Sequence, residues 1–242
     1  MKRRKVSLRD SRRRPVGLAW RMVFASIRKV VSRLFPRMTV EGYSPDLRHG
    51  TIFVSNHLNS FGPMAMMLRF PAEPRPWVLS DVMERGSCSR YIEVDFVRKE
   101  LGIGRPLSRA ISLAIELICV PLMRYVGAIP VYRRNRKVAR TFAATRVCLD
   151  AGESVVIFPE LMGTAYNDVL NRLDNGFVEV LRQAWLAEGR LFRIVPVYVD
   201  KARRRLRVGA EISYDPERPF KSERLRIEHL LEEEMSRLAK CP

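Results

Sequence analysis

The 242-residue sequence predicts an α/β fold, with a largely parallel central sheet flanked by helices. Short runs of β-branched and apolar residues, such as residues 51–55 and 154–158, have the composition of buried strands. They alternate along the chain with longer segments in which apolar residues recur at helical spacing. Such alternation indicates a parallel sheet, because neighbouring parallel strands need a crossover connection. Hydrophobic residues make up 47% of the chain, which is enough for one well-buried core.

The expected elements follow one another in a regular order. Residues 39–42 begin a strand–turn pattern, and further strands are expected at residues 51–55, 77–79, 127–132, 154–158 and 193–199. Helices are expected at residues 15–35, 63–70, 107–126, 138–150, 176–188 and 222–239. Pro15 suits a first helical turn, Pro36 stops the first helix, and Gly152 ends the helix at 138–150.

The longest apolar stretch, residues 107–126, is interrupted by Arg109, Glu116 and Arg124. A spanning helix requires about 20 predominantly apolar residues. We therefore expect a buried or monotopic helix here, with a kink at Pro121. The N-terminus lacks the uninterrupted apolar core of a signal peptide.

The first 37 residues form a basic arm. They hold 13 of the 44 Lys and Arg and one Asp, so most of the formal net charge of +18 lies there. The apolar residues of the helix at 15–35 fall in an arc of about 120°, with basic residues opposite. A basic amphipathic helix is typical of a segment that lies in an anionic membrane interface. The apolar stripe could equally pack on the protein's own core. We expect this arm at 1–37 and an α/β domain at 38–242.

The four cysteines, Cys88, Cys119, Cys148 and Cys241, have no short spacing between any two. This pattern argues against a zinc site and against a disulfide framework, and it favours a reducing compartment. We expect no metal and no tightly bound cofactor.

His57 is the strongest catalytic candidate. It follows the strand at 51–55, where side chains commonly point into the crevice at the carboxyl edge of a sheet. The two other histidines, His49 and His229, lie in a turn and a charged helix and are expected at the surface. Residues 55–63, with the sequence SNHLNSFGP, resemble the Asn-His-x-x-x-x-Asp-Pro block of the glycerolipid (lysophosphatidic acid) acyltransferases.

The resemblance continues in order through most of residues 38–200. Residues 127–134 are similar to the family's second block, a strand that ends in arginine. Residues 155–160 are similar to the third block, Phe-Pro-Glu-Gly-Thr-Arg-Ser, and residues 194–197 to the fourth. Four blocks in this order imply the acyltransferase fold.

This resemblance implies a function. A membrane-associated enzyme of phospholipid biosynthesis would move a fatty acyl chain from acyl-CoA or acyl carrier protein to a hydroxyl of a lysophospholipid. His57 would be the general base, and apolar residues of the helix at 107–126 would line the acyl groove. The residues implied to bind substrate are Asn56, Arg133, Arg134, Glu160, Gly163 and Thr164. The expected location is the cytoplasmic face of a membrane, peripheral or monotopic, with the anionic lipid surface as a partner.

Two departures from the family pattern bear on activity. Gly62 stands where the family has the aspartate that holds the histidine ring. In the third block, Leu161 and Met162 intervene before Gly163, and Ala165 and Tyr166 replace the arginine and serine. Carboxylates that could replace the aspartate are Glu160, Asp81 and Asp168, of which Glu160 is the first candidate. Gly62→Asp is expected to preserve or raise acyl transfer by rebuilding the family pair, provided that Gly62 has backbone angles that a residue with a Cβ can adopt.

Two other classes of function remain as alternatives. A family member that has lost catalysis and binds lipid would explain Gly62 and the altered third block. Nucleic-acid binding rests on positive charge alone and ranks last, because the sequence carries no zinc-finger or RNA-binding signature.

Overall fold

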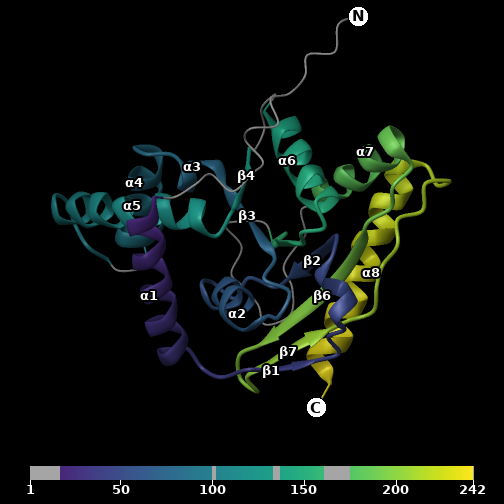
Figure 1. The fold of residues 1–242 in the computed structure, drawn as a ribbon, viewed down its shortest axis with the longest axis horizontal. Coiled ribbons are helices and arrows are strands. Elements are labelled where there is room, and N and C mark those ends of the chain that lie inside the picture. The colour runs from purple at the N-terminus through teal and green to yellow at the C-terminus, as the bar shows by residue number, and fades with distance from the viewer. Residues whose placement is uncertain (1–16, 100–101, 133–136, 161–174, 242) are drawn as a thin grey trace, which may run out of the picture. The chain divides into compact units, whose positions relative to one another are not determined.

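The computed structural model describes residues 17–99, 102–132, 137–160 and 175–241. Its centre is a mostly parallel seven-stranded sheet in the order β1-β7-β6-β2-β5-β3-β4, which confirms the predicted fold class (Figure 1). The strands are β1 Thr39–Glu41, β2 Thr51–Ser55, β3 Arg75–Leu79, β4 Ile129–Val131, β5 Val155–Ile157, β6 Arg193–Asp200 and β7 Arg205–Val208. Only β6 and β7 pair antiparallel.

Most of the helices agree with the expected ranges. They are α1 Leu18–Leu34, α2 Phe61–Arg69, α3 Ser80–Met83, α4 Ser87–Ile92, α5 Leu107–Tyr125, α6 Val138–Asp150, α7 Val178–Glu188 and α8 Phe220–Lys240. The α3–α4 region and strand β7 were not expected. None of the helices in the described ranges is both long and apolar enough to cross a bilayer.

The contacts of the backbone group the chain into two compact units. The first holds residues 1–31 and 77–141, and the second holds residues 32–76 and 142–242. The division into a basic arm at 1–37 and a domain at 38–242 stays a prediction.

The second unit is built on β2, β5, β6 and β7. Successive residues of a strand point to opposite faces, so Val197 and Val199 of β6 meet one layer and Tyr198 meets the other. Val197 and Val199 share a core with Ala65 and Met66 of α2. Tyr198 packs against Met235 and Leu238 of α8, which lies along β6 and β7 (Figure 1).

The end of α1 is fixed by one arginine of α2. Arg69 donates to the carbonyl oxygens of Ser32, Phe35 and Pro36 at 2.5, 2.6 and 3.0 Å. The last carbonyls of a helix have no partner within the helix, so this guanidinium serves as the C-terminal cap.

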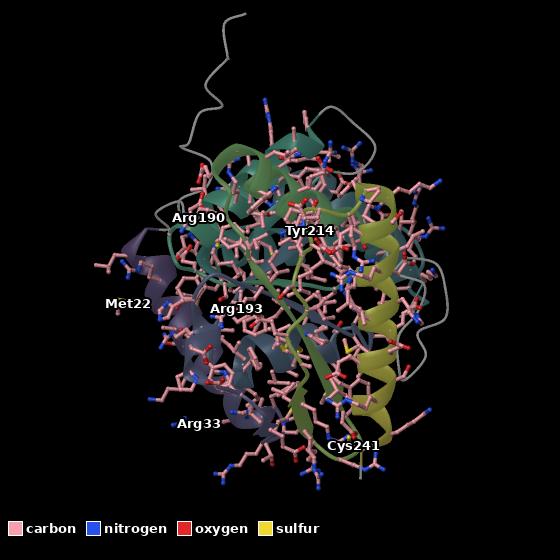
Figure 2. The ribbon with its side chains drawn as sticks, turned by 90° about the vertical axis from the view of Figure 1, so that its right-hand side faces the viewer. Met22, Arg33, Arg190, Arg193, Tyr214 and Cys241 are labelled. Atoms are coloured by element: carbon pink, nitrogen blue, oxygen red, sulfur yellow. The ribbon has the colours of Figure 1, made fainter. Side chains whose placement is uncertain are left out.

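In the first unit, α1 leaves its apolar stripe exposed. Phe24 is its one buried side chain, packed against Tyr125 of α5 at 5.5 Å between ring centroids. Trp20, Val23, Ile27 and Val30 are between 37% and 53% exposed. Figure 2 shows the side chains of Met22 and Arg33 pointing away from the helix. The alternative in which the stripe packs on the protein's own core is wrong for these residues.

Candidate active site

His57 lies at the carboxyl edge of the sheet, as predicted. It is the second residue after β2, which pairs in parallel with β5 on one side and β6 on the other. Ligands of open α/β sheets bind at this edge, because the loops that follow parallel strands converge there. The other two histidines, His49 and His229, are exposed, as expected.

Glu160 is brought to His57 from the end of β5. The backbone N–H of His57 donates to Oε1 of Glu160 at 2.8 Å. Glu160 is only 5% exposed, so this charge-assisted bond lies in a poorly hydrated place. The carboxylate therefore holds the main chain of His57. The expected contact of Glu160 with the acceptor stays a prediction.

The imidazole of His57 also meets an aromatic ring. Its centroid lies 5.3 Å from that of Phe158, in an edge-on arrangement. Burial lowers the pKa of His57 below its ordinary value of 6.5, whereas backbone hydrogen bonds of Asn59 and of His57 itself act in the opposite direction. The lowered pKa keeps the imidazole neutral at pH 7, and a general base requires this form.

Asn56 has a structural role, and its expected contact with substrate stays a prediction. Its side chain is fully buried. Its Nδ2 donates to the carbonyl oxygen of Val199 at 3.1 Å, and its Oδ1 accepts from the N–H of Val199 at 2.8 Å. The amide thus clamps β6 to the residue that precedes His57. This burial and the two bonds to Val199 count against a direct contact with substrate.

The turn after His57 has no room for a Cβ at position 62 unless its backbone shifts. A Cβ built on Gly62 would lie 2.4 Å from the carbonyl oxygen of Asn56 and 2.5 Å from that of His57. The N–H of Gly62 donates to the same oxygen of His57 at 3.0 Å, which closes the turn. Leu58 and Asn59 have φ angles of 45° and 55° within it. The expectation that Gly62→Asp rebuilds the family pair stays untested, but the space in this turn counts against it, because the neighbouring atoms are backbone and cannot rotate away.

Several predicted site residues lie outside the described residues. These are Arg133 and Arg134 of the second block, Gly163 and Thr164 of the third block, and Asp168. Asp81 belongs to α3 in the first unit. Of the predicted set, the structure therefore brings together His57, Asn56 and Glu160.

Sequence reasoning missed the cation Lys201 at this edge. Lys201 follows β6, and its Nζ lies 5.4 Å from the ring centroid of Phe61, the first residue of α2. The signal was present in the sequence, since residues 201–205 read KARRR directly after a strand.

No group of three or more potential metal ligands occurs in the described ranges. All four cysteines are free thiols. Two grooves of about 500 and 530 Å³ lie along α8, and neither is lined by His57 or Glu160.

Comparisons with known proteins agree with this architecture. The model of the Acyltransferase family matches residues 107–200, which contain the second to fourth blocks, and His57 precedes this region. No curated protein matches the sequence. The fold is similar to the crystal structure of the 1-acyl-sn-glycerophosphate (LPA) acyltransferase PlsC from Thermotoga maritima. The TM-score is 0.51 at 15% identity, over 93% of this chain and 83% of that chain. The chain thus matches the Acyltransferase family model over residues 107–200 and shares its fold with an LPA acyltransferase.

Proposed function

We propose that this protein is a membrane-associated O-acyltransferase of phospholipid biosynthesis. It transfers a fatty acyl chain from acyl-CoA or acyl carrier protein to a hydroxyl of a lysophosphatidic acid-like lipid. The observation that carries the proposal is the position of His57 at the carboxyl edge of the sheet, directly after β2, with its main chain held by Glu160. A base in a fixed position with a suitable pKa is the requirement for activating a hydroxyl.

The reaction needs no covalent intermediate on the protein. His57 accepts the proton of the acceptor hydroxyl while the oxygen attacks the thioester carbonyl. The tetrahedral intermediate then collapses, the C–S bond breaks, and the sulfur takes the proton from the imidazolium. The products are an ester and a free thiol, and His57 returns to its neutral form.

The remaining roles are assigned by the resemblance. Arg133 and Arg134 follow the second-block strand and would bind the phosphate of the acceptor, because the guanidinium fork forms two parallel hydrogen bonds with phosphate oxygens. Gly163 and Thr164 would shape the acceptor site beside Glu160.

The first unit offers a surface for an anionic membrane. Besides α1, helix α5 leaves Leu107, Leu113, Leu117 and Ile118 between 48% and 59% exposed. With Ala110 and Ala114, which are also exposed, they cover an arc of about 140° of the helix at 100° per residue. Apolar faces flanked by arginines suit an interface of anionic lipid, where each basic residue near the surface contributes about 1 kcal/mol. We place the protein on the cytoplasmic face, peripheral or monotopic.

Release of thiol from acyl-CoA and from acyl carrier protein, measured against a panel of lysolipids, tests the catalytic part. His57→Ala should lower turnover about a thousandfold, because general-base catalysis contributes about 10²–10⁴. His229→Ala removes an exposed histidine of α8 and should leave the rate unchanged. Undiminished turnover by His57→Ala would remove His57 from the mechanism.

Sedimentation with vesicles of anionic lipid tests the membrane part. Val23→Glu places a charge on the exposed apolar face of α1 and should weaken binding about tenfold. Ala25→Glu adds the same charge to the opposite, exposed side and serves as the control. Equal binding by the two variants would contradict the assignment of this face.

The lack of room for a side chain at Gly62 favours one alternative, a lipid-binding protein without turnover. The carboxylate that the family uses has no room at this position. Binding of lysolipid without thiol release by any donor and acceptor pair would decide for this alternative.

A further inference from the structure

The turn between β6 and β7 lies beside the His57 motif. Ser55 of β2 is in register with Val197 of β6, and the side chain of Asn56 clamps the main chain of Val199. The turn begins two residues after Val199, at Lys201. Its position relative to His57 is therefore set by buried hydrogen bonds in the second unit.

Lys201 stands over an aromatic surface of the motif. Its ammonium lies 5.4 Å from the ring centroid of Phe61, four residues after His57. The Phe61 ring in turn packs against Phe35 at 5.0 Å. A cation over the face of a ring is held electrostatically while its N–H groups remain available to a ligand.

The nearby acids are already engaged by other arginines. Asp200 is 5% exposed and pairs with Arg203 at 3.2 Å and with Arg207 at 3.4 Å. Glu41 pairs with Arg205 at 3.3 Å and with Arg207 at 3.2 Å. These two carboxylates thus pair with the three arginines that flank the turn and are not available to the cations at its tip.

Among the described residues, three exposed cations remain at this edge, and we call Arg37, Lys201 and Arg204 the cationic rim. The N–H of Thr39 donates to the carbonyl oxygen of Arg204 at 3.0 Å, which brings the segment after α1 to the turn. Within the described ranges no carboxylate forms an ion pair with any of the three. Exposed charges without counter-ions, next to a candidate catalytic base, are suited to an anionic substrate.

We propose that the cationic rim binds a phosphate monoester group of a substrate that reacts at His57. This inference rests on the proposed acyl transfer. A dianionic phosphate matches several neighbouring cations better than a single carboxylate does, and Lys and Arg are its usual protein ligands. Two sources carry this group: the 3′-phosphate of coenzyme A on the donor side, and the headgroup of lysophosphatidic acid on the acceptor side.

Calorimetric binding to the full-length protein tests the rim without requiring turnover. The probes are coenzyme A against dephospho-coenzyme A, and micellar lysophosphatidic acid against monoacylglycerol. Lys201→Ala/Arg204→Ala should weaken binding of one phosphate-bearing probe about tenfold and leave its phosphate-free counterpart unchanged. The control Lys221→Ala/Lys240→Ala removes the same net charge from exposed positions of α8 in the same unit and should bind as wild type.

The pattern of loss identifies the source of the phosphate. A loss of affinity confined to coenzyme A assigns the rim to the donor, and a loss of affinity confined to lysophosphatidic acid assigns it to the acceptor. Unchanged affinity of the rim variant, an equal loss in the α8 control, or a wild-type protein that binds none of the probes would overturn the proposal. Thermal unfolding of both variants checks that they are folded. The His57→Ala turnover assay tests the proposed function separately.

Discussion

The backbone N–H of His57 and the carboxylate of Glu160 are joined by a 2.8 Å hydrogen bond between residues 103 positions apart in the sequence. This bond connects the ends of β2 and β5, two neighbouring strands of the sheet. Removing the acceptor would leave a poorly hydrated N–H without this partner, and such a loss costs about 1–3 kcal/mol. Glu160→Ala should therefore lower the free energy of unfolding by at least about 1 kcal/mol, as measured by urea denaturation. Glu160→Gln retains an acceptor oxygen and should lower the free energy of unfolding by less than Glu160→Ala does. Glu232→Ala, at an exposed position of α8, provides a control and should change the free energy of unfolding by less than about 0.5 kcal/mol.

The close approach of backbone atoms to Gly62 predicts that no side chain is tolerated there. Gly62→Ala should destabilise the protein by about 1–3 kcal/mol, because the turn must move to make room. Gly62→Asp should destabilise at least as much and should not restore a catalytic pair. Gly104→Ala is the matched control, since a Cβ at Gly104 meets nothing within 4 Å. If Gly62→Asp raised both turnover and stability, the turn described here would be wrong.

The clamp between Asn56 and Val199 predicts that loss of the Asn56 side chain lowers the free energy of unfolding more than the changes at Glu160 and Gly62 do. Asn56→Ala leaves the N–H and the C=O of Val199 without these bonds inside the core and should cost about 2–4 kcal/mol. Ser60→Ala changes an exposed residue in the same turn whose side chain forms no capping bond, and it should be nearly neutral. Equal stabilities of the two variants in urea would show that the clamp contributes little.

The lowered pKa of His57 predicts how stability depends on pH. Between the folded-state pKa and 6.5, the unfolded state binds more protons at this position than the folded state does. The contribution of His57 to stability is therefore present above pH 6.5 and declines as the pH falls through that window. As the pH is lowered from about 7.5 to about 5.5, the unfolding free energy of wild type should therefore fall relative to that of His57→Gln. A difference that does not vary over this range would contradict the lowered pKa. If His57 is the general base, the acid limb of turnover should likewise lie below pH 6.5.

The sequence alone determined the alternation of strands and helices and the location of His57. The bounds of β2, Thr51–Ser55, were predicted without error, because a fully buried strand requires a run of apolar and β-branched residues. Helix α6 at Val138–Asp150 was likewise predicted with its bounds, since apolar spacing and the stop at Gly152 are local signals. Strand β7 escaped prediction because its four residues, RLRV, carry two arginines. Burial of Arg207 depends on its ion pairs with Asp200 and Glu41 and on its hydrogen bond to the carbonyl oxygen of Leu238.

The tertiary structure decided which of the site residues act together. Asn56 precedes the histidine of a recognised motif, yet its amide is engaged by Val199, 143 positions away. The role of Gly62 likewise depends on how closely the carbonyl oxygens of Asn56 and His57 approach it. Local patterns report propensity and periodicity, whereas hydrogen bonds between distant strands and the room for a single Cβ exist only once the chain has folded.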